Sequence, residues 1–346
     1  MTRFRVLLAV FAVGALGIVV RSQTSPPDAA YRFTQIQPGV YSALGTGRLN
    51  VGSNSAVIVN QDDVVIVDSH ITPEAARAML RELKAITDKP VTTLINTHFH
   101  YDHTNGNQVF PATVDIIGHE FTRMKLTADP MHTGMLSQAL AAAPRQVEAL
   151  KARVAAERDP AAKAKLEQQL EVQSAYARQL LELKPTPPNV TMNDRMTLYR
   201  GGREIRLMYL GRGHTGGDLV VYLPKERVLC SGDLLVNGIA NLVDGYVNDW
   251  PDTLEKLKPL DFVDVIPGHG DPFKGKERID YFQAYLRDVW QQASRLHAAH
   301  VPVEEAAKRI DMTAHKAHYA TIQGPGLNPV YVQRMYDVMD GTAQND

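Results

Sequence analysis

The chain has 346 residues, 44% of them hydrophobic, which fits one large α/β domain or two smaller ones. Its 37 Lys and Arg nearly balance its 38 Asp and Glu, so there is no basic excess to attract phosphate backbones, and no nucleic acid is expected as a partner. The single cysteine, Cys230, excludes an internal disulfide, and its place in an apolar run predicts a buried strand residue.

The N-terminus has the composition of an export signal. Arg3 and Arg5 precede an uncharged apolar run, 6–20, which is shorter than the roughly 18 residues expected of a membrane span. We therefore expect residues 1–30 to be a signal peptide and linker, and the protein to be secreted or periplasmic. No clean cleavage site is visible, so an uncleaved signal anchor remains the one expected route to a membrane.

Short apolar runs predict strands in the first third of the chain. The runs 56–59 and 64–67 flank Asn60-Gln61-Asp62-Asp63, which is typical of a hairpin between two buried strands. A helix is expected from the cap-type residue Thr72, followed by Pro73, to about Asp88. Further strands are expected within 31–41, at 91–95 and at 114–118.

From about residue 121 to residue 184 the composition changes to Ala, Gln, Glu, Lys and Arg, with leucines at helical spacing. Asp159-Pro160 interrupts this pattern, which predicts a helical hairpin. A packed insertion, a lid over the site and a surface for homo-oligomer formation all fit such an arm.

Strand patterns then return and are followed by helices. Because several of these strands are joined by turns, part of each sheet should be antiparallel. The order predicts two sheets with helices outside, in one domain of residues 31–275 with a helical C-terminal extension, 276–346. The strands are expected at 205–210, 219–223, 227–230 and 263–266, and a long helix at 277–299.

Four potential metal ligands directly follow the expected strand 91–95. His98 and His100 are two residues apart, so on an extended chain their imidazoles point to the same side. Asp102 and His103 come where the chain must turn, which can aim them at a second nearby point. Imidazole and carboxylate together are the ligands of a borderline divalent ion such as zinc.

Three later stretches each place another metal-capable side chain just after a strand. His214 is surrounded by glycines, Asp233 follows the strand 227–230, and His269 follows the strand 263–266. Glycine beside a ligand lets the backbone turn sharply and approach a cofactor closely. Each stretch is a weak signal alone, but in this order they strongly indicate one metal centre.

This set of residues resembles the ligand motifs of the metallo-β-lactamase superfamily over roughly residues 40–271. Asp68, at the end of the strand 64–67, matches the family's first motif, usually a structural carboxylate behind the ligands. The resemblance implies an α/β fold (α+β), a four-layer αβ/βα sandwich with metals at one edge between the two sheets. It also implies that His98, His100 and His214 hold one metal ion, that Asp102, His103 and His269 hold the other, and that Asp233 bridges them.

The implied cofactors are two divalent metal ions, in the first place Zn2+, although iron or manganese could occupy the same ligands. A water bridging two dications loses a proton near neutral pH, and Asp102 and Asp233 would hold this catalytic centre. Two dications, these two carboxylates and a hydroxide leave one net positive charge, which suits a tetrahedral oxyanion. Hydrolysis of an activated C–O, C–S or C–N bond by a metal-dependent hydrolase is therefore expected.

The residue at position 233 distinguishes between classes of hydrolase within this superfamily. β-Lactamases with a cysteine ligand carry Cys there and a Lys three residues later, where this chain has Asp233 and Val236. A bridging aspartate resembles hydroxyacylglutathione hydrolases and lactonases instead. We expect an exported dinuclear zinc hydrolase of a small-molecule ester, lactone, thioester or lactam. The alternatives are a β-lactamase, and a non-hydrolytic periplasmic metal-bound binding or relay protein that uses the arm as its partner surface.

Five further histidines are not expected to bind metal. His70 is interpreted as a simple loop residue, although it lies close to Asp68. His119 and His132, at the start of the arm, are expected on the surface. His315 and His318 are three apart, as on one helix face, and without an acidic partner nearby a solvated face is expected.

The loop after Asp233 contains aromatic and amide side chains that could contact a substrate. Tyr246 and Trp250 could form a pocket wall or pack in the core, and both interpretations stay open. Asn241 could polarise a substrate carbonyl.

Overall fold

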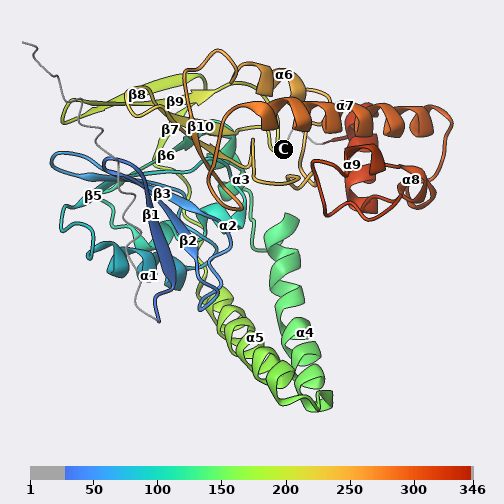
Figure 1. Ribbon diagram of the computed structural model, residues 1–346, viewed down its shortest axis with the longest axis horizontal. Coiled ribbons are helices and arrows are strands. Elements are labelled where there is room, and N and C mark those ends of the chain that lie inside the picture. The colour runs from blue at the N-terminus through green and yellow to red at the C-terminus, as the bar shows by residue number, and fades with distance from the viewer. Residues whose placement is uncertain (1–27, 344–346) are drawn as a thin grey trace, which may run out of the picture.

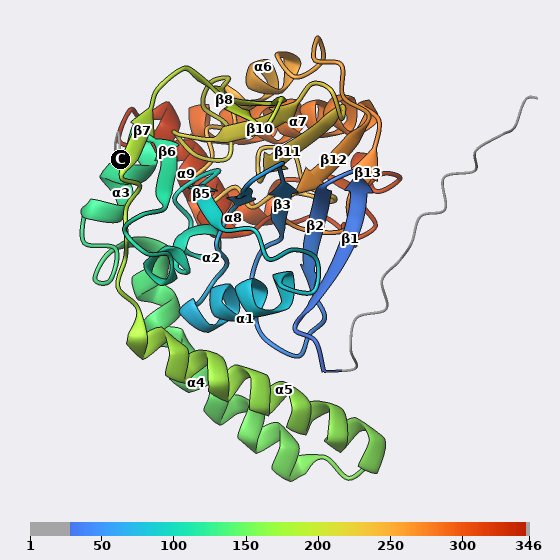
Figure 2. The same cartoon turned by 90° about the vertical axis from the view of Figure 1, so that its left-hand side faces the viewer.

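A computed structural model describes residues 28–343, so the apolar run on which the export signal is expected lies outside the described residues. Within the described part, two sheets pack face to face, and helices cover the outer face of each sheet (Figure 2). In that view α1 (Pro73–Leu83) lies on one side, and α6 (Trp250–Glu255) and α7 (Glu277–Ala298) lie on the other. This is the expected four-layer α/β sandwich.

The first sheet combines an antiparallel half and a parallel half. Neighbouring strands from β1 to β4 are antiparallel, and those from β4 to β7 are parallel. Its order is β1 (Tyr31–Gln37), β2 (Val40–Gly45), β3 (Ser55–Val59), β4 (Val64–Val67), β5 (Val91–Ile95), β6 (Asp115–His119) and β7 (Val190–Met192).

The second sheet is antiparallel except at one pair, β11 and β12, which run parallel. Its order is β13 (Phe273–Lys274), β12 (Asp264–Pro267), β11 (Val228–Gly232), β10 (Leu219–Leu223), β9 (Arg203–Tyr209) and β8 (Arg195–Arg200). Each sheet therefore contains strands whose carboxyl ends open toward the same edge.

The strand sequences explain why the molecule has layers on both sides of each sheet. In β4 all four residues are buried, and they alternate between two cores: Val64 and Ile66 pack toward α1, whereas Val65 and Val67 pack between the sheets. An apolar side chain at every position is typical of a strand that is covered on both faces. Cys230 in β11 is buried in the core between the sheets, as expected.

The helical hairpin consists of α4 (Gly134–Ala156) and α5 (Pro160–Gln179), preceded by α3 (Glu120–Thr127). It extends away from the body of the molecule as a two-helix arm (Figure 1). Asp159 caps α5 by accepting a hydrogen bond from the Ala162 amide at 2.7 Å, so the predicted break lies where the second helix begins. After the second sheet, α7, α8 (Val303–Arg309) and α9 (Pro329–Met339) form the C-terminal extension.

Two sequence expectations about the elements are wrong. The first helix ends at Leu83 instead of Asp88, because its last turn tightens and the chain must return to pair β5 with β4. β7 and β8 were not expected, since β7 is very short and β8 is a charged edge strand whose residues alternate between exposed and half-buried.

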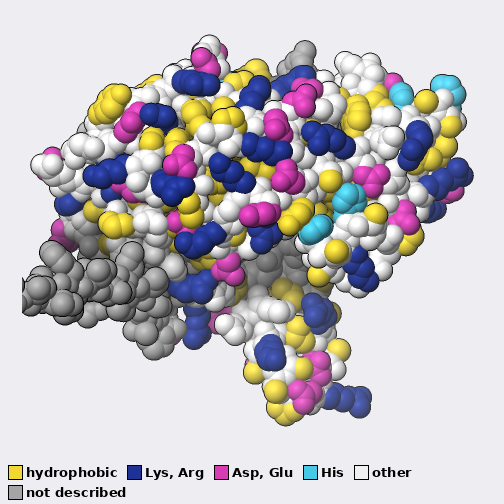
Figure 3. Space-filling model, turned by 45° about the horizontal axis from the view of Figure 1, so that its top comes forward, with side chains coloured by type: hydrophobic (Ala, Val, Ile, Leu, Met, Phe, Trp, Pro, Cys, Tyr) yellow, Lys and Arg dark blue, Asp and Glu magenta, His cyan; other side chains and the backbone are white. Residues whose placement is uncertain are grey.

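The outer face near β8, α6 and α7 carries basic and acidic side chains intermixed (Figure 3). Lys258 pairs there with Glu255 at 2.7 Å and with Asp280 at 2.8 Å. Among residues 28–343, no helix has both the length and the apolar character needed to cross a bilayer.

The packing of the loop after β5 can be tested by a substitution at Gly106. A Cβ at this position would overlap the carbonyl oxygen of Ser69 and lie 2.7 Å from the Cβ of Ala76. We expect Gly106→Ala to lower the free energy of unfolding by about 1–3 kcal/mol, measured from urea unfolding curves. Gly324→Ala is the control, because its Cβ would meet no atom within 4 Å. Equal midpoints for the two variants would contradict this packing.

Candidate metal centre

Seven predicted ligands converge at the edge where the carboxyl ends of several strands meet. The first four follow β5, on the loop to α2 (Tyr101–Thr104) and on α2 itself. His214 lies between β9 and β10, Asp233 directly after β11, and His269 directly after β12. The seven are His98, His100, Asp102, His103, His214, Asp233 and His269.

The first group is a compact triad of buried imidazoles. Ligand atoms of His98, His100 and His214 all lie within 4.8 Å of one another. Nε2 of His214 is 2.9 Å from Nδ1 of His100, so two ring nitrogens face the same point. Three convergent imidazole nitrogens are a common donor set for a divalent transition metal.

The second group is more exposed and contains one carboxylate, Asp102. Asp102, His103 and His269 also bring ligand atoms to within 4.8 Å of one another. Nε2 of His269 lies 3.1 Å from Oδ2 of Asp102 and 3.2 Å from Oδ2 of Asp233.

Asp233 reaches both groups. Its Oδ2 lies 3.5 Å from Nε2 of His214 in the first triad, and its Oδ1 lies 3.6 Å from Nε2 of His103 in the second. Because one carboxylate has two oxygens, it can contact two ions at once, which is the role that the sequence assigned to it.

Hydrogen bonds on the far side of each ring set which nitrogen faces the centre. Nδ1 of His214 donates to the carbonyl of Asn241 at 2.9 Å, and Nε2 of His100 donates to Asp244 at 2.9 Å. Nδ1 of His103 donates to Asp68 at 2.8 Å. Each ring therefore presents the lone pair of its other nitrogen to the centre, as a metal requires.

Two buried polar atoms support the same conclusion. Among the described residues, Nε2 of His98 and Oδ1 of Asp233 have no hydrogen-bond partner although both are buried. A buried polar atom without a partner costs about 1–3 kcal/mol, and a bound ion would remove this cost at both atoms. Both belong to the predicted donor set, and the site therefore fits divalent ions.

The electrostatics of the two groups differ. Burial and the neighbouring imidazoles hold the pKa of His98 well below its usual range, and burial followed by His100 lowers that of His214 to about 3. These rings are neutral donors. Burial opposes charge at Asp233, but His269 and His103 overcome it and hold its pKa well below the ordinary value. His98 and His214 are thus neutral, and the shared carboxylate is ionised.

Glycines allow the backbone to approach the ligands. A Cβ on Gly268 would overlap Oδ1 of Asp233 and lie 2.9 Å from Cε1 of His103. Gly232 has a φ of +51°, a left-handed conformation that turns the chain between β11 and Asp233. The glycines that flank the predicted ligands are therefore needed by the geometry.

Asp244 is a functional residue that the sequence analysis missed. It lies in a loop with no strand before it, so the strand-end pattern that located the ligands gave no signal. Its carboxylate fixes His100, and its own backbone is held by Arg334 of α9, whose Nη2 donates to the Asp244 carbonyl at 3.2 Å. The C-terminal extension thus supports a ligand of the first triad.

Three expectations for other histidines are wrong. His70 is fully buried with a φ of +71°, and its ring bonds to the Ser53 carbonyl at 3.0 Å and the Ser55 hydroxyl at 2.9 Å. His119 is buried and caps α3. His315 has an acidic partner, Asp288 at 2.9 Å, from α7.

The other histidines and the loop residues that the sequence singled out lie on the surface, in the core or at the metal pocket. His132 is exposed, as expected, and His318 stacks on Tyr281 with ring centroids 3.7 Å apart. Trp250 and Tyr246 are core residues, with the Trp250 ring centroid 5.5 Å from that of His214. Asn241 is exposed and lines the mouth of the metal pocket.

A pocket of about 290 Å³ opens onto these ligands. It will be called the metal pocket, and no Lys or Arg occurs among the described residues that line it. Its lining consists of His100, Tyr101, Asp102, Met135, Asp233, Val236, Ile239, Ala240, Asn241 and His269.

Comparisons with known proteins agree with this geometry. Residues 49–269 match the family model of the metallo-beta-lactamase superfamily. Among curated proteins, the chain is 24% identical to a metallo-beta-lactamase type 2 of Bacillus sp. (strain 170) over 73% of this chain and 80% of that protein. It is 34% identical to the metallo-beta-lactamase type 2 of Bacteroides fragilis, but over only 31% of this chain and 45% of that enzyme.

Two further similarities are to a sulfatase and to a solved structure. The chain is 22% identical to a linear primary-alkylsulfatase of Pseudomonas sp. (strain ATCC 19151) over 82% of this chain and 55% of the sulfatase. A solved metallo-beta-lactamase from Pontibacter korlensis shares the fold with a TM-score of 0.53 at 19% identity, covering 74% of this chain and 99% of that one.

Asp244 can be tested apart from the ligands. We expect Asp244→Ala to weaken zinc binding roughly 10- to 100-fold, because His100 loses the carboxylate that orients it. Competition with a chromophoric chelator measures the affinity. Asp252→Ala removes an exposed carboxylate from α6 and should leave the affinity unchanged. Equal affinity of both variants would show that Asp244 does not position His100.

Proposed function

The chain belongs to the metallo-β-lactamase superfamily and is a metal-dependent hydrolase, and from this we propose that it is an exported dinuclear zinc enzyme. The observation that carries the proposal is Asp233, whose two carboxylate oxygens lie next to ligands of both metal groups. Zinc is favoured because buried neutral imidazoles and carboxylates are its usual donors. Export is supported by the apolar run 6–20 after Arg3 and Arg5.

Two divalent ions, when bound, lower the pKa of water and polarise the substrate carbonyl. The protein residues supply the geometry for this chemistry. Asp68 fixes His103, and it also accepts hydrogen bonds from the Thr97 amide and hydroxyl, both at 2.8 Å. Asp102 and Asp233 both line the metal pocket and both lie next to Nε2 of His269, so a reacting water there would be close to two fixed carboxylates.

The lining of the metal pocket favours an uncharged substrate. A carboxylate substrate would require a cation, but position 236 is a buried valine and no Lys or Arg lies among the described lining residues. We therefore propose a small ester, lactone, thioester or lactam without a recognition carboxylate. Asn241, at the mouth of the pocket, is placed to contact a substrate carbonyl.

β-Lactam hydrolysis is the second candidate, and the names of the Bacillus and Bacteroides relatives support it. Those names also count against the non-hydrolytic binding or relay protein. We rank this candidate second because β-lactam drugs carry a carboxylate. No Lys or Arg among the described lining residues of the metal pocket would pair with it.

The proposal is tested with purified protein and four probes: p-nitrophenyl acetate, a thioester, a γ-lactone and nitrocefin. We expect about two zinc ions per chain by elemental analysis, and turnover that a chelator removes and zinc restores. Losing a residue that hydrogen-bonds to a metal ligand typically costs up to roughly 100-fold. Asp233→Ala should reduce turnover by more than this, since it removes the shared ligand itself.

Asp271→Ala is the matched control, because that carboxylate is 71% exposed and pairs only with Arg32 among the described residues. Turnover that survives complete metal removal, or protein without any transition metal, would contradict the proposed function.

A further inference from the structure

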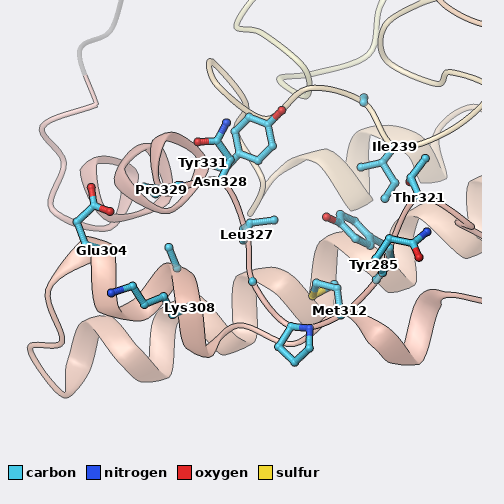
Figure 4. A pocket seen from close by; sticks show the side chains of 17 residues that line it. Ile239, Tyr285, Glu304, Lys308, Met312, Thr321, Leu327, Asn328, Pro329 and Tyr331 are labelled. Carbon is cyan, nitrogen blue, oxygen red and sulfur yellow. The ribbon is translucent and has the colours of Figure 1, made fainter. Parts of the chain in front are cut away.

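Two of the hollows that adjoin the metal pocket differ in how they meet it. The larger, about 590 Å³, lies within the C-terminal extension, where Leu327 and Tyr285 line it (Figure 4). It shares only Ile239 and Ala240 with the metal pocket, and none of the seven predicted ligands lines it. The smaller hollow, by contrast, includes a ligand.

This second hollow, about 370 Å³, lies at the foot of the two-helix arm and will be called the arm-base cavity. It is formed where α2 meets α3, the start of α4 and the segment that joins them. Its lining residues are Phe99, His100, Tyr101, Asn105, Lys125, Leu126, Ala128, Pro130, Thr133, Gly134, Met135, Leu136 and Asp244.

The arm-base cavity continues from the metal pocket. His100, Tyr101 and Met135 line both spaces, and His100 is a ligand of the first triad. Met135 is half-buried at the first turn of α4, at the boundary between them. A substrate whose reacting bond lies at the metal centre could therefore extend past Met135 into the arm-base cavity.

The wall of the arm-base cavity is apolar and held in place. Leu126 and Leu136 are buried, with 7% and 5% of their surface exposed. The Phe99 ring packs against Phe121 with centroids 5.9 Å apart, and Nζ of Lys125 lies 5.3 Å from the Phe99 centroid. Pockets of roughly 300–1,000 Å³ with such linings usually bind apolar groups.

Three of the polar groups that line the arm-base cavity are engaged within the protein. Asp244 accepts from His100, and Asn105 donates to the carbonyl of Ile71 at 3.1 Å. The Thr133 hydroxyl donates to the carbonyl of Asp129 at 3.0 Å. The removal of apolar surface from water is therefore the main contribution that this cavity offers a ligand.

We propose that the arm-base cavity is a substrate subsite that binds an apolar alkyl or aryl substituent of the molecule cleaved at the metal centre. The proposal rests on the proposed hydrolase function and adds to it a substrate class: esters, thioesters or lactones with a medium-length apolar chain. The arm then acts in substrate selection, through the residues at its foot.

Chain length is the first test. Two ester series are used on zinc-loaded protein, one with acyl groups from acetyl to octanoyl and one with alcohols from ethanol to octanol. We expect kcat/KM to rise up to roughly fourfold per methylene in one series until the cavity is filled. Turnover with no dependence on length in either series would overturn the subsite and leave the hydrolase assignment intact.

Met135→Trp is the second test, because a larger ring at the boundary should close the passage. We expect the ratio of kcat/KM for the longest ester to kcat/KM for the shortest ester to fall at least tenfold in this variant. Met124→Trp is the matched control, since Met124 is 43% exposed on α3 and does not line the cavity. Equal loss for short and long esters in Met135→Trp would count against the subsite.

A third measurement needs no turnover, so it separates failure of the subsite from failure of the hydrolase function. Calorimetric titration compares binding of 1-octanol with that of 1-propanol to the wild type and both variants. We expect 1-octanol to bind the wild type and Met124→Trp at least tenfold more tightly than it binds Met135→Trp. Octanol binding that Met135→Trp leaves unchanged would overturn the proposal, whatever the ester assays give.

Discussion

The buried carboxylate of Asp68 links the sheet to the metal centre. It lies at the end of β4 with a φ of +65°, a strained conformation for a residue with a side chain. Its oxygens accept hydrogen bonds from the Thr97 amide, the Thr97 hydroxyl and Nδ1 of His103, all at 2.8 Å. Thr97 in turn contacts Nδ1 of His98 at 3.0 Å. One side chain therefore orients a ligand of each metal group, which explains why a buried charge and a strained backbone are tolerated there.

The position of the ligands follows from strand direction. β4 runs parallel to β5 in the first sheet, and β11 runs parallel to β12 in the second, so four carboxyl ends open at one edge. This is why ligands could be located from the sequence alone: four of them cluster just after the apolar run of β5, and His214, Asp233 and His269 each follow a later strand beside a glycine. Their hydrogen-bond partners could not be located in this way. Asp244 lies within the loop between β11 and α6, away from a strand end, and Arg334 of α9 holds its carbonyl while its carboxylate contacts His100.

The errors of the sequence interpretation have a common cause in tertiary packing. His70 and His119 look like loop histidines, but each is buried because another element covers it. The hydroxyl of Ser55 and the carbonyl of Ser53 satisfy the ring of His70, and Tyr209 of the second sheet covers His119 with ring centroids 4.3 Å apart. Edge strand β8 was missed because its charged residues resemble a loop. The layers themselves could be predicted because period-two and period-3.6 patterns are local, whereas these contacts join residues far apart in sequence.

The arm is attached to the centre by packing on the residue next to a ligand. Tyr101, which directly precedes Asp102, packs against a cluster containing Leu136 of α4 and Tyr176 of α5. The base of the arm is also fastened next to α1, since the hydroxyl of Thr72, which caps α1, donates to Gln179 at the end of α5 at 2.8 Å. A displacement of the arm would therefore move Tyr101 and the wall of the metal pocket together. Asp102 and His103 lie together with Tyr101 in the single turn of α2. The residues that would hold metal and those that would contact substrate therefore move together. Changes in the arm should consequently alter substrate binding and metal binding together.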